Sequence, residues 1–94
     1  MVINRFVDLN RKKIAILFEL TMGNIFYRLK RYNEALSYYD KVLERDTGFL
    51  DALVNKGHAL YQLKRFHEAN SYYDKALKQT TGKSLLSNNS STHM

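Results

Sequence analysis

Apolar residues recur every three or four positions over most of the chain, which is the spacing of one face of an α-helix. Three short polar stretches interrupt the recurrence, so the pattern predicts four helices, at residues 14–30, 32–46, 49–64 and 66–80. In the second of these, the apolar face is carried by Tyr32, Leu36, Tyr39 and Leu43. The pattern therefore predicts an all-α protein built from antiparallel helix hairpins.

The second half of the chain repeats the first. Residues 29–48 read LKRYNEALSYYDKVLERDTG and residues 63–82 read LKRFHEANSYYDKALKQTTG, with thirteen of twenty aligned positions identical at an offset of 34. Such identity within 94 residues indicates that one structural unit has been duplicated. In each unit a basic Lys-Arg pair opens the turn, and Glu34 or Glu68 falls near the positive N-terminal end of the second helix.

One glycine lies within the first helix of each unit, where glycine costs up to about 1 kcal/mol relative to alanine. These glycines are Gly23 and Gly57, at the offset of the repeat. The cost is explained if another helix approaches closely at these positions. We expect Ala35 and Ala69, on the second helices, to face them.

The ends of the units suggest the domain organisation. Gly48 and Gly82 follow the second helices, and we expect them to cap these helices in the left-handed conformation. The stretch from Ser84 onward is rich in Ser, Asn and Thr and is expected to be disordered. The predicted segments are an N-terminal helical segment at 1–15, the first repeat at 16–49, the second repeat at 50–83 and a tail at 84–94.

The N-terminal segment carries Ile3, Phe6, Val7 and Leu9 as apolar residues. Neither glycine nor proline separates it from the next helix, and its apolar stripe keeps the helical phase into that helix. We therefore expect helix throughout, although a separate short helix is the alternative.

The period and the small and aromatic positions resemble the tetratricopeptide repeat family, whose pattern is Trp-x2-Leu-Gly-x2-Tyr, then Ala-x3-Phe, then Pro. The corresponding positions hold Glu19, Met22, Gly23, Phe26, Ala35, Tyr39 and Thr47 in the first unit, and Leu53, Lys56, Gly57, Leu60, Ala69, Tyr73 and Thr81 in the second. The Trp and Pro positions differ, and Lys56 is polar where an apolar residue is usual. The resemblance covers residues 16–83 and implies a right-handed stack of hairpins, an alpha-alpha superhelix.

In the resembled family, the first helices line a concave groove that holds an extended or helical peptide. The resemblance implies a peptide site on the first helices of this chain, formed by Leu20, Asn24, Tyr27, Arg28, Val54, Asn55, His58, Tyr61 and Gln62. Asn24 and Asn55 are implied to pair with the peptide backbone, because an amide both donates and accepts hydrogen bonds. The apolar and tyrosine members would then select side chains.

Asn24 and Asn55 also match the asparagines with which some family members hold the C-terminal carboxylate of a chaperone. The lysine expected one turn before Asn24 is Leu20 here, and the basic pair expected on a third unit has no counterpart in two units. We therefore do not expect a full carboxylate clamp.

The sequence offers no arrangement of residues suited to catalysis or metal binding. Cysteine is absent, and His58, His67 and His93 form no His-Glu-x-x-His or other paired motif. Glycine-rich phosphate loops are absent as well. We expect a protein that is not an enzyme and needs no cofactor.

The net charge of the chain indicates which kind of partner it favours. Fifteen Lys and Arg residues against nine Asp and Glu residues give a net charge of +6, which favours acidic partners. The basic clusters at 11–13, 30–31 and 64–65 leave a nucleic-acid-binding module as an alternative, although solvated helix turns explain the same charges. No apolar run is long enough for a membrane span and no signal peptide is visible, so we expect a cytoplasmic protein.

Self-association is the remaining expectation. Repeat arrays usually end in a helix with a polar outer face, and none follows the second unit here. We expect Leu53, Leu60, Tyr72 and Leu77 to be partly uncovered and a homodimer to form. The predicted function is thus a protein-interaction scaffold that binds a peptide or helix, with a self-assembling structural module as the main alternative.

Overall fold

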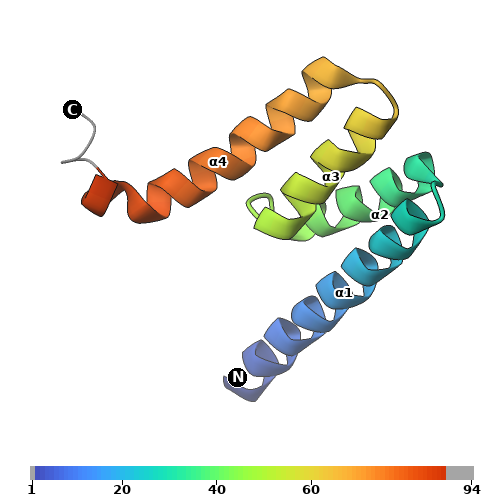
Figure 1. Cartoon of the computed structure of the whole chain (residues 1–94). Coiled ribbons are helices and arrows are strands. Elements are labelled where there is room, and N and C mark those ends of the chain that lie inside the picture. Colours follow the sequence, from blue (N-terminus) through green and yellow to red (C-terminus); the bar gives the residue numbers. More distant parts are fainter. Residues whose placement is uncertain (1, 89–94) are drawn as a thin grey trace.

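The computed structural model describes the backbone of residues 2–88 and the side chains of residues 4–81. Its four helices are α1 (Val2–Arg28), α2 (Tyr32–Arg45), α3 (Leu50–Gln62) and α4 (Phe66–Asn88), as Figure 1 shows. Helices α1 and α2 form one antiparallel hairpin and α3 and α4 form the other, and the hairpins stack mainly through α2 and α3. The predicted all-α stack of hairpins is confirmed, and no strand occurs within residues 2–88.

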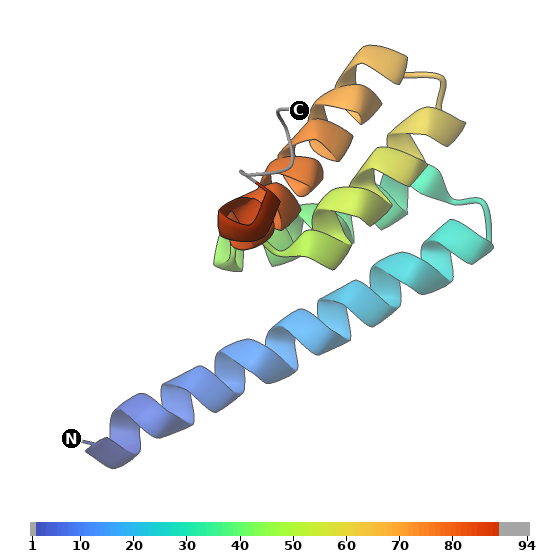
Figure 2. The same ribbon diagram turned by 60° about the vertical axis from the view of Figure 1, so that its left-hand side comes forward.

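The N-terminal segment is the front half of α1 and not a separate helix. Residues 4–14 are exposed to solvent, and this half of the helix projects beyond the other three (Figures 1 and 2). The continuous helical phase of the sequence predicted this continuity.

Helix α4 runs through Gly82 to Asn88, so the prediction that it ends at this glycine is wrong. The predicted tail therefore begins inside a helix, because residues 84–88 are helical. Residues 89–94 lie outside the described part of the chain.

Lysines, and not glycines, take the left-handed conformation that we expected at helix ends. Lys30 has φ 63° and Lys64 has φ 64°, and each follows a first helix. Gly48 does not have a positive φ; its N–H donates to Oδ1 of Asp46 at 3.1 Å. The expected cap at Gly48 is therefore wrong.

Each left-handed lysine belongs to a two-bond C-cap. In the first unit, the N–H of Arg31 donates to the carbonyl of Phe26 at 2.8 Å, and the N–H of Lys30 donates to the carbonyl of Tyr27 at 2.9 Å. These are the two bonds of a Schellman motif, which satisfies the last carbonyls of a helix. The equivalent bonds are present 34 positions later, so the repeated Leu-Lys-Arg sequence is the cap of both first helices.

Tyrosine rings fill the space beside the glycines of the first helices. A Cβ atom on Gly23 would lie 2.6 Å from Cε1 of Tyr39, and one on Gly57 would lie 2.5 Å from Cε1 of Tyr73. The close approach that we predicted is therefore present, but the nearest atoms belong to these tyrosines and not to the alanines four residues before them. Only glycine leaves room for the ring.

Helix α3 lies between α2 and α4 and is covered from both sides. Leu53 and Leu60 of α3 are 2% and 1% exposed, so the expectation that they are uncovered is wrong. Leu77 of α4, by contrast, is 62% exposed, as expected. The main core cluster joins both hairpins and consists of Ala35, Leu36, Tyr39, Ala59, Leu60 and Ala69.

Glu19, at the position of the Trp in the resembled pattern, is buried yet paired. Its carboxylate accepts two hydrogen bonds from the guanidinium of Arg45, both at 2.9 Å, and this pair joins α1 to α2. A buried carboxylate with two charge-assisted bonds avoids most of the cost of desolvation.

Lys56, polar where an apolar residue is usual, is also paired. Its Nζ lies 2.5 Å from Oδ1 of Asp40 and 2.9 Å from the hydroxyl of Tyr72, and it sits over the ring of that tyrosine. Burial lowers the pKa of Lys56, but the bonds to Asp40 and Tyr72 outweigh burial and raise it. The lysine therefore stays charged and links α2, α3 and α4.

We predict that Gly57→Ala destabilises the protein by up to about 2 kcal/mol, because overpacking against Tyr73 costs about 1–3 kcal/mol and the gain in helix propensity returns about 1 kcal/mol. In a Tyr73→Leu background, the same alanine should instead stabilise by about 1 kcal/mol, since only the propensity gain remains. Urea unfolding followed by circular dichroism measures both values. The same sign in both backgrounds would show that the ring does not require the glycine.

We also predict that Lys64→Gly stabilises the protein by about 0.5–1 kcal/mol. A left-handed residue with a Cβ costs about 1–2 kcal/mol, which glycine avoids. The larger conformational entropy of glycine in the unfolded chain offsets about 0.4–1 kcal/mol of this gain. Lys78→Gly, on an exposed interior position of α4, is the matched control and should destabilise by about 1 kcal/mol. Equal losses of stability in the two variants would contradict the assigned cap.

Candidate functional site

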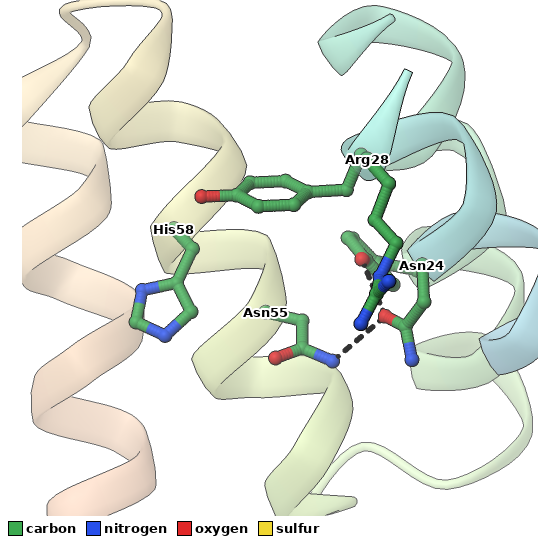
Figure 3. A pocket seen from close by; sticks show the side chains of 6 residues that line it. Asn24, Arg28, Asn55 and His58 are labelled. Carbon is green, nitrogen blue, oxygen red and sulfur yellow. Dashed lines mark hydrogen bonds between the residues drawn. The ribbon is translucent and has the colours of Figure 1, made fainter. Parts of the chain in front are cut away.

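An open hollow of about 290 Å³ lies between the first helices of the two hairpins. Its lining residues are Asn24, Tyr27 and Arg28 of α1, Tyr39 of α2, and Asn55 and His58 of α3 (Figure 3). The structure thus brings together five of the nine residues that the sequence placed in the peptide groove. None of the lining residues is acidic.

A hydrogen-bonded network fixes the two amides of the hollow. Oδ1 of Asn24 accepts a bond from the hydroxyl of Tyr39 at 2.6 Å and another from Nδ2 of Asn55 at 3.0 Å (Figure 3). Burial raises the pKa of Tyr39 to about 12, so its hydroxyl keeps its proton at neutral pH and can donate. The network leaves Nδ2 of Asn24 and Oδ1 of Asn55 without a hydrogen-bond partner among the described side chains.

The second unit repeats part of this network. His58 is the counterpart of Asn24 at the offset of the repeat, and its Nδ1 lies 2.7 Å from the hydroxyl of Tyr73. Burial raises the pKa of Tyr73, and the tautomer of His58 decides which of the two groups donates in this bond.

Arg28 supplies the positive charge of the hollow. Its side chain lies beside Asn24 in Figure 3 and is exposed. Across residues 4–81, no acidic side chain forms an ion pair with it. Its five N–H donors are therefore available to a ligand.

The other four predicted groove residues do not line the hollow. Leu20 packs against the core clusters, and Val54 is half-buried. Tyr61 is 54% exposed, and its ring makes an edge contact with Phe66 at a centroid distance of 5.0 Å. Gln62 is exposed at the end of α3.

Tyr39 is the site residue that sequence reasoning missed, because we assigned it to the core alone. Its ring is indeed buried, but its hydroxyl reaches Asn24. The sequence contained a signal: the resembled pattern has Phe at this position, and both units of this chain have Tyr. A hydroxyl added to a buried ring needs a hydrogen-bond partner nearby.

The basic clusters at the helix turns are partly neutralised. The guanidinium groups of Arg31 and Arg65 each form two hydrogen bonds with the carboxylate of Glu34 and Glu68, respectively. These pairs explain the repeated basic residues as parts of the turns. They weaken the alternative of a nucleic-acid interface. Of the three basic clusters, only the one at residues 11–13 is exposed with no ion pair to a carboxylate among the described residues.

Two other features are absent from the described part of the chain. Within that part, no group of three or more His, Asp or Glu residues could hold a metal ion. None of the described helices has the length and apolar character needed to cross a membrane.

Comparison with known proteins gives one assignment. No curated protein matches the chain. The model of the tetratricopeptide repeat, a module that generally mediates protein–protein interaction, matches residues 14–78. The match begins where α1 meets the rest of the protein and extends into α4, so it takes in both hairpins. Because it spans well over half of the sequence, the chain belongs to the tetratricopeptide repeat family.

Proposed function

We propose that the chain is a non-catalytic protein-interaction module that holds an extended peptide with an acidic side chain in the hollow between α1 and α3. The observation that carries this proposal is the pair of amides fixed by Tyr39. Asn24 offers a donor and Asn55 offers an acceptor, close together and unused by the described part of the chain. This pair matches what a peptide backbone needs.

The geometry of an extended chain explains the match. The N–H and the C=O of one residue point to the same side of a strand, as in the closely spaced pairs of an antiparallel ladder. One peptide residue can therefore accept a bond from Asn24 and donate a bond to Asn55. Because both contacts are to backbone, they do not depend on the side chain of that residue.

Charge then supplies the preference for an acidic peptide. Arg28 can hold a carboxylate through two parallel N–H donors, and the imidazole of His58 lines the same hollow. The net charge of +6 also raises the local concentration of acidic partners. The proposed peptide site consists of Asn24, Tyr27, Arg28, Asn55 and His58.

Two features favour weak, backbone-directed binding over a tight fit to a small molecule. The hollow of about 290 Å³ is at the lower limit of typical ligand pockets, so it suits a short stretch of chain. The amide of Asn24 is already oriented by two hydrogen bonds, which lowers the entropy lost on binding.

Self-association as a homodimer is a second candidate function, and a separate observation favours it. Large apolar side chains are exposed along α1, among them Ile14 and Leu17 at 66% each. A row of such residues on one helix is typical of a surface that binds another protein.

We predict that peptides selected from a random nine-residue library are enriched in Asp and Glu, and that Arg28→Gln removes this enrichment. Asn55→Ala should weaken all selected peptides about tenfold, because it removes one backbone hydrogen bond of about 1.4 kcal/mol. Fluorescence anisotropy with labelled peptides measures the affinities. Asn70→Ala and Arg11→Gln change exposed residues outside the hollow and serve as matched controls.

Unchanged affinity in a folded Asn55→Ala variant would place the peptide site elsewhere. Selected peptides that lack acidic residues, with full binding to Arg28→Gln, would keep the backbone site but remove the proposed role of Arg28.

A further inference from the structure

The face of α1 that points away from the hairpins carries exposed apolar residues along its described length. We call this face the outer stripe; it consists of Phe6, Val7, Ile14, Leu17, Phe18 and Ile25, with Leu29 in the turn that follows. The opposite face of the same helix carries Ile16, Glu19 and Gly23, which are buried. Helix α1 thus has one face that is covered by the hairpins and one apolar face that is exposed.

The outer stripe repeats every eleven residues. Val7, Phe18 and Leu29 are eleven apart, and so are Ile14 and Ile25. Eleven residues complete three turns at about 3.67 residues per turn, close to the geometry of a straight helix. The stripe therefore stays on one side of α1 from end to end and presents a straight seam.

The seam also carries polar residues at a repeated position. Asn10 and Thr21 are eleven apart and lie between the apolar members of the stripe. A single polar position inside an apolar seam is typical of helix–helix contacts, where it fixes the alignment of the partners. A helix that lies on a lipid surface gains nothing from polar side chains in its apolar face.

The projecting half of α1 is not covered by the rest of the described chain. Residues 4–14 are exposed on all sides (Figure 2), and isolated helices shorter than about 12–15 residues are marginal in water. Packing along the outer stripe would supply the missing contacts.

We propose that two copies of this chain pair through their outer stripes, with the two α1 helices antiparallel and the two-fold axis near Phe18. In this arrangement, Val7 of each copy lies at the level of Leu29 of the other. The projecting half of each α1 then packs on the outer face of the partner's first hairpin. The inference rests on the proposed self-association and gives it a surface.

The available area is sufficient for a stable dimer. Six side chains of the stripe expose between 45% and 66% of their surface. With about 150–250 Å² for a large side chain, each contributes about 100 Å², so two copies bury about 1,200 Å². That value reaches the range of specific protein interfaces.

Charge favours the antiparallel orientation. A parallel pair would place the basic cluster of residues 11–13 beside the same cluster of the other copy. In the antiparallel pair, Arg11 lies at the level of Ile25 of the other copy, about 20 Å from its own counterpart at 1.5 Å per residue. That separation exceeds the Debye length of about 8 Å at physiological ionic strength, so the repulsion is screened.

Sedimentation equilibrium tests the dimer and its surface. The parent chain, 11.1 kDa as a monomer, should dimerise with a micromolar dissociation constant. Leu17→Glu should raise this constant at least about 100-fold, because each interface would bury two unpaired charges. Leu77→Glu makes the same change at an equally exposed leucine of α4 and should leave the constant unchanged.

Cysteine cross-linking tests the orientation, since the chain has no cysteine of its own. Phe18→Cys lies near the proposed axis and should form a disulfide-linked dimer, whereas Val7→Cys alone should not. A mixture of Val7→Cys and Leu29→Cys should give the mixed dimer. Efficient self-linking of Val7→Cys would establish a parallel pair and overturn the proposed arrangement.

Three further results would overturn the inference. A parent that stays monomeric up to about 100 μM, roughly 100-fold above a micromolar constant, would remove the self-association itself. A dimer that survives Leu17→Glu would place the interface on another surface. A monomer that sediments with phosphatidylserine vesicles, but loses this binding on Leu17→Glu, would assign the stripe to a membrane surface.

Discussion

The contact between a glycine on a first helix and a tyrosine on a second helix is the interaction on which both the fold and the site depend. Because Gly23 has no Cβ, the ring of Tyr39 lies against the backbone of α1 and closes the hairpin. The same ring carries its hydroxyl to Asn24, the next residue along the helix. The second unit repeats the arrangement through Tyr73 and His58. The glycine–tyrosine contact therefore determines both the core packing and the orientation of the polar groups in the hollow.

The hairpins could be predicted from the sequence, whereas the chain conformation at their ends could not. The offset of 34 and the helical spacing of apolar residues determine which segments are helices and how they pair. We assigned the left-handed conformation to Gly48 and Gly82 because glycine adopts it at low cost. The structure places it at Lys30 and Lys64, where a tight turn must reverse the chain within each hairpin. Tertiary packing, and not the local preference of glycine, determines which residues adopt the left-handed conformation.

The candidate site could be predicted only in part, for a related reason. The resemblance implied which positions of α1 and α3 face a groove, and five of those nine residues line the hollow. The distance between these helices depends on how the hairpins stack, and the direct bond between the two amides follows from it. Leu20 shows the limit of positional reasoning, since the resemblance implied a groove position but the side chain packs against the core.

The bond between Asn24 and Asn55 has a consequence for the shape of the whole repeat, because it joins one hairpin to the other. The angle at which the hairpins stack determines how far apart these amides lie. A ligand that engages both amides favours one curvature of the superhelix over others. By thermodynamic reciprocity, a contact elsewhere that favours the same curvature raises the affinity of that ligand, and the ligand strengthens that contact by the same factor.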